Sequence, residues 1–99
     1  MNLYLLIQSI HTGYDTFDSS VVAAESEPQA RLLHPNSRVK GWDEDEESWF
    51  IIPAAGPMKG QRRFVRPDEW CTPSEVGVMW IGTAGGLEPG TIISSFNGA

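Results

Sequence analysis

The segment Leu3-Tyr4-Leu5-Leu6-Ile7-Gln8-Ser9 is apolar over its first five residues and polar at its end. Alternate side chains of a β-strand point to opposite faces, so Leu3, Leu5 and Ile7 would share one face. The other face, which begins with Tyr4 and Leu6, is also largely apolar. A strand that is apolar on both faces is typical of the interior of a sheet. We therefore predict a sheet with residues 3–9 as a central strand.

Short apolar runs separated by Gly and Pro indicate further strands. We expect the second run to pair with the first as a hairpin, across a loop that contains Gly13. The third and fourth runs are expected to form another hairpin, because a turn rich in Gly and Pro joins them. A flexible, Gly-rich connection joins the last two runs. In chain order, the expected strands after the first are residues 21–24, 48–52, 61–65, 76–81 and 91–96.

One short helix is predicted after residues 21–24. Ser26-Glu27-Pro28-Gln29 has the pattern of a capping box, with Ser26 as the N-cap and Gln29 three residues later. Pro35 would end the helix at or before residue 34. A helix of about two turns is not stable alone and must pack on a sheet. The segment Thr72-Pro73-Ser74-Glu75 has the same pattern and predicts a single capped turn.

These elements predict one α+β domain over residues 1–99. Its expected architecture is two layers, a mostly antiparallel sheet of five or six short strands with one short helix packed on one face. Residues 36–75 are expected to form a variable acidic loop and hairpin region, with residues 36–47 as loop. Because one short helix covers only part of a sheet whose central strand is apolar on both faces, we favour a symmetric homodimer.

The charge balance limits the classes of partner. Seven Lys and Arg against thirteen Asp and Glu give a net charge of −6. Such a chain repels nucleic acid phosphates and anionic membrane surfaces, so we expect no direct nucleic acid and no membrane partner. A protein with a basic surface is the favoured electrostatic complement. The alternative is that the acidic residues serve only solubility.

Location and redox setting follow from the termini and the cysteine count. No apolar run is long enough to span a membrane, and the first residues lack the basic start of a signal peptide. Cys71 is the only cysteine, so no internal disulfide forms. We therefore expect a cytoplasmic protein, with Cys71 as a small, partly buried filler.

The first candidate site is an acidic run flanked by tryptophans. Aromatic residues beside a charge cluster are typical of an interaction surface. Alternatively the run is a solvated loop balanced by the cations of residues 59–66, and Trp42 fills the core, as we expect for Trp80. The predicted partner-binding residues are Trp42, Asp43, Glu44, Asp45, Glu46, Glu47 and Trp49.

The second candidate is the polar and aromatic cluster at residues 11–20. It could form a ligand or partner loop, although Asp and Ser also stabilise turns through bonds to the backbone. Its His and Asp spacing matches no metal pattern, so we expect neither a metal nor a cofactor. The residues singled out for this loop are His11, Tyr14, Asp15 and Asp18.

No catalytic constellation stands out. The Gly-rich segment 82–90 lacks the Lys of a phosphate-binding loop, and a strand rather than a helix is expected after it. Cys71 has no His with helpful sequence context. We therefore expect a non-enzymatic protein.

Motifs at both ends of the chain carry a resemblance. At the N-terminus they are Asn2-Leu3-Tyr4-Leu5-Leu6, Thr12-Gly13-Tyr14-Asp15-Thr16 and Val21-Val22-Ala23-Ala24-Glu25-Ser26, with Ala30-Arg31 and His34-Pro35. At the C-terminus they are Ile81-Gly82-Thr83-Ala84 and Gly90-Thr91-Ile92-Ile93-Ser94-Ser95-Phe96-Asn97. These motifs resemble a group of small uncharacterised proteins carried by phages and prophages. The match covers about half the chain and excludes residues 36–75.

The resemblance implies an accessory gene of a mobile element, acting in the host cytoplasm. By analogy, small acidic proteins in that setting often inhibit host machinery, including restriction and CRISPR defence. The leading hypothesis is thus an inhibitor that binds a host protein, such as a nucleic-acid-binding defence complex, through its acidic surface. The alternatives are a module that sequesters a small molecule or nucleotide, and a structural or virion accessory protein.

Overall fold

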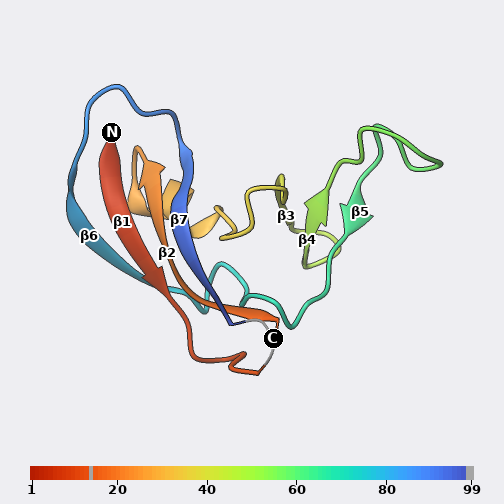
Figure 1. Ribbon diagram of the computed structural model, residues 1–99, viewed down its shortest axis with the longest axis horizontal. Coiled ribbons are helices and arrows are strands. Elements are labelled where there is room, and N and C mark those ends of the chain that lie inside the picture. Colours follow the sequence, from red (N-terminus) through yellow and green to blue (C-terminus); the bar gives the residue numbers. More distant parts are fainter. Residues whose placement is uncertain (14, 98–99) are drawn as a thin grey trace.

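The apolar N-terminal segment forms β1 (Asn2–Ile7), an inner strand of a four-stranded antiparallel sheet. The structure is a computed structural model that describes residues 1–13 and 15–97. The order of the strands in this sheet is β6-β1-β2-β7 (Figure 1). Its other members are β2 (Thr16–Ala24), β6 (Gly77–Thr83) and β7 (Gly90–Asn97). The predicted central position of the first strand is confirmed.

The strand β2 begins five residues earlier than predicted. Thr16, Phe17, Ser19 and Ser20 pair with β1 or β7, and the register shifts at Asp18 between them. The hydroxyl and Asp side chains of this segment hide the strand pattern in the sequence. Thr16 and Ser20 are buried despite their polarity. The polar start of β2 therefore belongs to the sheet and not to the preceding loop.

A second, three-stranded sheet lies beside the first (Figure 1). It contains β3 (Gly41–Asp43), β4 (Ser48–Ile51) and β5 (Arg63–Phe64) in that order. The predicted β4–β5 hairpin is confirmed by the pairing of Phe50 with Phe64. The prediction that residues 36–47 are all loop is wrong, because β3 pairs with β4. The α+β class with one short helix is confirmed, and the described residues form seven strands in two sheets instead of the expected five or six in one.

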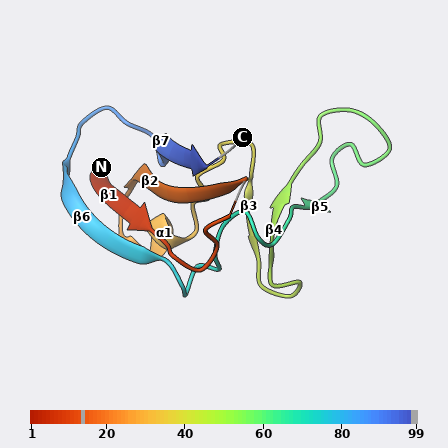
Figure 2. The same cartoon turned by 60° about the horizontal axis from the view of Figure 1, so that its bottom comes forward.

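The helix α1 (Glu27–Arg31) has the predicted N-cap. Ser26 Oγ accepts the N–H of Gln29 at 3.4 Å, and Gln29 Oε1 accepts the N–H of Glu25 at 2.6 Å. Arg31 donates to the backbone oxygen of Val76 at 2.7 Å, which ties the helix to the segment before β6. Figure 2 shows the four-stranded sheet curving around α1, which lies against one face only. No helix in residues 1–13 and 15–97 is long and apolar enough to cross a membrane.

The core lies between the helix side of the large sheet and the second sheet. Both sheets contribute to it, together with α1 and the segment before β6. The buried cluster is Tyr4, Leu6, Phe17, Val22, Ala24, Ala30, Trp49, Trp70, Cys71 and Val76.

The prediction that Trp80 belongs to the core is wrong, because 59% of its surface is exposed. It lies on the edge strand β6, where the sheet has no further neighbour. Its indole Nε1 donates to Asn2 Oδ1 at 3.2 Å.

Candidate functional site

The acidic run forms the end of the β3–β4 hairpin. Trp42 pairs with Trp49 and Asp43 pairs with Ser48, and residues 44–47 make the turn between the strands. Asp43 Oδ1 accepts the backbone N–H of Glu46 at 2.9 Å, which closes the turn. Residues 44–47 are all exposed. We call residues 44–47 the acidic tip.

Asp43 differs from the residues that follow it, because it is paired. Arg62 contacts its carboxylate at 2.6 Å, and only 13% of the Asp43 side chain is exposed. The bond from the Glu46 backbone and the Arg62 guanidinium hold the pKa of Asp43 below its usual value. Among the described residues, no ion pair includes a residue of the acidic tip. Of the ion pairs expected between the acidic run and the cations of residues 59–66, the structure therefore contains only the one at Asp43 among its described residues.

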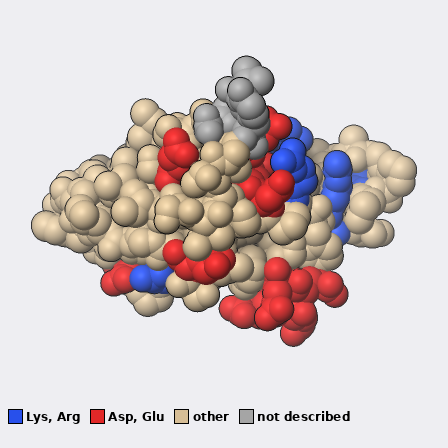
Figure 3. Space-filling model, turned by 90° about the horizontal axis from the view of Figure 1, so that it is seen from below, with Lys and Arg blue, Asp and Glu red and all other residues tan. Residues whose placement is uncertain are grey.

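A groove of about 410 Å³ separates the acidic tip from the turn at residues 72–74. Trp42, Glu44 and Glu47 line one side of it, and Thr72, Pro73 and Ser74 line the other. The opposite wall is held in shape because the Thr72 N–H and hydroxyl both donate to Glu75 Oε1 at 3.0 Å, as the predicted capped turn requires. Figure 3 shows acidic side chains gathered in a protruding group at the bottom of the picture, where the β3–β4 turn lies in Figure 2.

The two tryptophans of the predicted surface have different surroundings. Trp49 is only 2% exposed, and its Nε1 donates to the Cys71 backbone oxygen at 3.0 Å. Its indole therefore belongs to the core. Trp42 is half-buried, with its ring 5.2 Å from that of Trp49 in an edge-on arrangement, and one side faces the groove. Of the two, Trp42 is the residue that a partner can touch.

The loop at residues 8–15 is organised by the side-chain amide of Gln8. Gln8 Oε1 accepts the N–H groups of Ile10 and His11 at 2.8 and 2.9 Å. Gln8 Nε2 donates to the backbone oxygens of His11 and Phe17, both at 2.7 Å. These four bonds join parts of the loop to one another and to the start of β2, so the role of Gln8 is structural.

The residues singled out in this loop occupy different surroundings. His11 is half-buried, whereas Asp15 and Asp18 are exposed, and Asp15 lies 3.8 Å from an Arg66 nitrogen. Tyr14 lies outside the described residues. Within the described part of the chain, no group of three or more His, Cys, Asp or Glu side chains could hold a metal ion.

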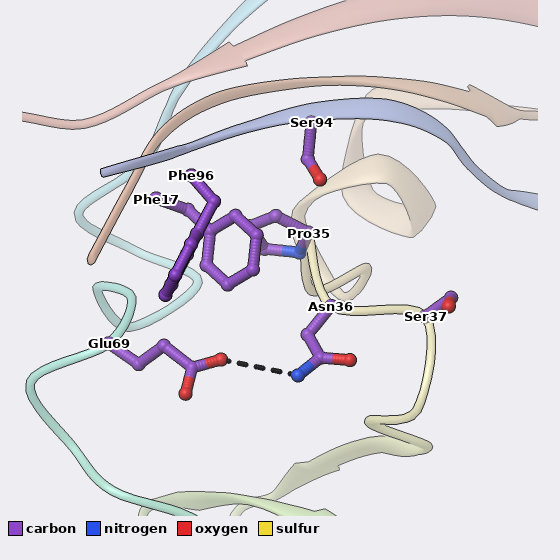
Figure 4. Close-up of a pocket in the computed structure, with 7 residues that line it drawn as sticks. All are labelled: Phe17, Pro35, Asn36, Ser37, Glu69, Ser94 and Phe96. Atoms are coloured by element: carbon purple, nitrogen blue, oxygen red, sulfur yellow. Dashed lines mark hydrogen bonds between the residues drawn. The ribbon is translucent and has the colours of Figure 1, made fainter. Parts of the chain in front are cut away.

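A further pocket of about 370 Å³, which the sequence did not indicate, lies between the start of β2, the end of β7 and the segment after α1 (Figure 4). Phe17 and Phe96 pack with ring centroids 4.7 Å apart on one side of it. Asn36 Nδ2 donates to Glu69 Oε1 at 3.4 Å on another side. Because its lining comes from four distant parts of the chain, no local motif could have predicted it.

Two buried groups have strongly shifted pKa values. Burial, and then the charge of Glu75, raise the pKa of the Cys71 thiol to about 11. Burial lowers the pKa of His34 to about 3, and its Nδ1 accepts the N–H of Asn36 at 3.0 Å. At neutral pH the thiol is protonated and the imidazole is neutral, so neither is poised as a nucleophile or a proton donor.

The recesses that the described residues form include an acidic groove beside the second sheet and an aromatic pocket at one end of the large sheet. A comparison with protein-family models, curated proteins and solved structures gave no match.

Proposed function

We propose that this protein is a non-enzymatic binding protein, which engages a basic surface of a partner protein through its acidic tip and Trp42. The groove beside Trp42 carries the proposal. One indole and the carboxylates of Glu44 and Glu47 line it. An aromatic ring flanked by carboxylates suits the side chain of a partner Arg or Lys, which can lie on the ring and pair with the acids.

The distribution of charge supports this orientation. Residues 43–47 contribute −5 of the net charge of −6, so the rest of the chain carries a net charge of only −1. A charge concentrated on one exposed turn produces a local field that speeds the approach of a basic partner. It also places the turn on the contact side of the encounter complex.

The partner class rests on the resemblance to phage- and prophage-borne proteins. In that setting we propose a host protein as the target, with the basic channel of a nucleic-acid-binding defence complex as the surface. An acidic turn in such a channel competes with nucleic acid phosphate for the same cations. Inhibition then follows from occupancy alone and requires no catalytic residue.

The test is an affinity pulldown from host lysate at low and high salt, with binding then measured to the captured protein. The variant E44S/D45S/E47S removes three charges from the tip. The variant D18S/E25S/E88S removes the same residue types from exposed sites elsewhere and serves as the control. We expect the tip variant to lose at least tenfold in affinity and most of its salt dependence. A tip variant that binds like the wild type, or a control variant that loses as much affinity as the tip variant, would overturn the proposal.

The pocket in Figure 4 favours a second candidate, the sequestration of a small molecule. Its volume of about 370 Å³ lies at the lower end of the range for ligand sites, and it combines two aromatic rings with an amide and a carboxylate. A thermal shift screen with nucleotides and cyclic dinucleotides tests it. Stabilisation that F96A abolishes would support this candidate, and no shift with any compound would remove it.

A further inference from the structure

The large sheet has a second face, which α1 does not cover. On β1 the buried Tyr4 and Leu6 point to the helix, so the alternate residues Leu3, Leu5 and Ile7 point to the opposite face. Strand pairing extends this face across the sheet, because Leu5 lies opposite both Met79 and Val21, and Val21 lies opposite Ile93. We call this surface the outer face. Its large apolar residues are Leu3, Leu5, Ile7, Val21, Met79 and Ile93.

The outer face is apolar and open to solvent. Ile93 is 65% exposed, Met79 is 56% exposed and Ile7 is 47% exposed. A solvated face of an antiparallel sheet normally carries polar side chains in alternation with the buried ones. Along β1 the outward-facing Leu3, Leu5 and Ile7 are apolar like the inward-facing Tyr4 and Leu6, which is the pattern of a strand covered on both sides. On β2 and β7, Ser19 and Ser95 interrupt the apolar outer face.

Charge is nearly absent from the whole sheet. Asp18 is the only charged residue in the sequences of β1, β2, β6 and β7. The sequences of the two edge strands, β6 and β7, also contain neither Lys nor Pro, the residues that commonly prevent pairing between edge strands. The acidic and basic residues gather instead on the second sheet and the loops.

We propose that the outer face is the contact surface between two copies of this chain. A basic partner finds no charge there, whereas a second copy of an acidic protein meets it without placing carboxylate against carboxylate. The acidic tip stays free in such a dimer, because Trp49 of the second sheet packs with Tyr4 and Leu6 on the opposite side. The dimer is thus independent of the proposed function.

The two halves of the outer face differ in shape, and this difference suits a two-fold symmetric contact. β1 and β6 carry the large Leu5, Ile7 and Met79. Between β2 and β7 lies a hollow of about 180 Å³, lined by Ser19, Ser20, Val21, Ile93, Ser94 and Ser95. Consider a two-fold axis that runs parallel to the strands and passes between β1 and β2. It places the β1–β6 half of one copy, with its large side chains, over the β2–β7 half of the other copy, with its hollow.

The area of the outer face indicates how strongly two copies would associate. Four strands spaced about 4.8 Å apart, each with about six residues of about 3.3 Å, make a face of about 400 Å² before side-chain relief is counted. Two copies then bury about 1,000 Å² in total, near the lower limit for a specific interface. We therefore expect a dimer with a dissociation constant in the micromolar range.

The experiment is sedimentation equilibrium of the full chain from low micromolar to several hundred micromolar. M79K and I93K each place a charge on the outer face, and M58K makes the same change as M79K at an exposed site outside the large sheet. We expect a monomer–dimer equilibrium in the wild type and in M58K. Each outer-face variant should raise the dissociation constant at least tenfold, with a far-UV circular dichroism spectrum like that of the wild type.

The two outer-face variants lie on opposite edge strands, so misfolding of one leaves the other as a test. A wild type that stays monomeric at every concentration would overturn the proposal. So would a dimer that M58K weakens as much as M79K. A monomer that binds vesicles of uncharged phospholipid through Met79 and Ile93 would likewise overturn it, by assigning the face to another occupant.

Discussion

His34 is a titratable side chain that the core holds in its neutral form. It is 4% exposed, and its ring lies 5.1 Å from that of Trp49 and 6.0 Å from that of Phe17. Because Nδ1 accepts the N–H of Asn36, the neutral ring carries its proton on Nε2. That nitrogen has no hydrogen-bond partner among residues 1–13 and 15–97, and the rings of Phe17, Trp49 and Trp70 lie around the imidazole. A second proton on this imidazole would introduce an unpaired charge into the core.

The fold should therefore lose stability as the pH falls below about 6.5, the value for an unfolded His. The folded pKa of His34 is about 3, so between these values the unfolded chain binds more protons. The free energy of unfolding should fall by up to about 1.4 kcal/mol per pH unit in that window. Urea denaturation at several pH values between about 7 and 4.5 checks this, above the range where most carboxylates titrate. H34N should be less stable at pH 7 but lack most of this slope, and an unchanged slope would contradict the assignment.

Gln8 shows how one amide can hold a loop. Four backbone groups bond to it, two as donors and two as acceptors. Q8E should cost about 2–3 kcal/mol at neutral pH, because a carboxylate cannot donate to the two backbone oxygens. Chemical denaturation of Q8E beside Q61E, the same change at an exposed site, measures the difference. Equal stability of the two variants would show that these bonds contribute nothing.

At the scale of elements, the β3–β4 hairpin contains one strained residue. Glu47 has a φ of 50°, in the left-handed region that side chains other than Gly and Asn adopt at a cost. E47N should therefore raise the free energy of unfolding by about 0.5–1 kcal/mol. E46N, which makes the same charge change at a neighbouring exposed position, should raise it less. Thermal unfolding of both variants compares the two gains in stability. A larger gain from E46N than from E47N would indicate relief of charge repulsion instead of backbone strain.

The sequence predicts some elements better than others. Elements specified by a local pattern are predictable, whereas those that depend on pairing with a distant segment are not. The central strand and both capped turns were predictable, because alternation and capping boxes are local patterns. β3 was missed because Gly41-Trp42-Asp43 has one apolar residue and becomes a strand only by pairing with β4. Trp80 was misplaced because alternation does not reveal that β6 is an edge strand.

The candidate site was predictable on one side only. The acids and Trp42 are adjacent in the sequence, so their proximity required no tertiary information. The other wall of the groove, at residues 72–74, comes from a turn about 30 residues away. Trp42 and Trp49 pair across the hairpin and so lie on the same face of it. Which of the two is covered depends on contacts with distant segments, such as the bond from Trp49 to the Cys71 backbone, and the sequence of the hairpin does not specify these.

At the scale of the whole molecule, the two sheets share one core. Trp49 of β4 packs in the same buried cluster as Tyr4 and Leu6 of β1, and its Nε1 bonds to the backbone of Cys71. The second sheet has three strands of two to four residues, too few to be stable alone. Its folding must therefore depend on the contact with the large sheet.

We expect the whole chain to unfold in one cooperative transition, with tryptophan fluorescence and far-UV circular dichroism tracing the same curve. W49A should destabilise the protein by about 3–5 kcal/mol, since it removes a buried indole and leaves a cavity between the sheets. W80A makes the same change at a 59% exposed site and should cost less than about 1 kcal/mol. Two separated transitions in the wild type, or similar losses in both variants, would mean that the sheets are independent units. A single transition that W49A shifts far more than W80A would instead identify Trp49 as the side chain that joins them.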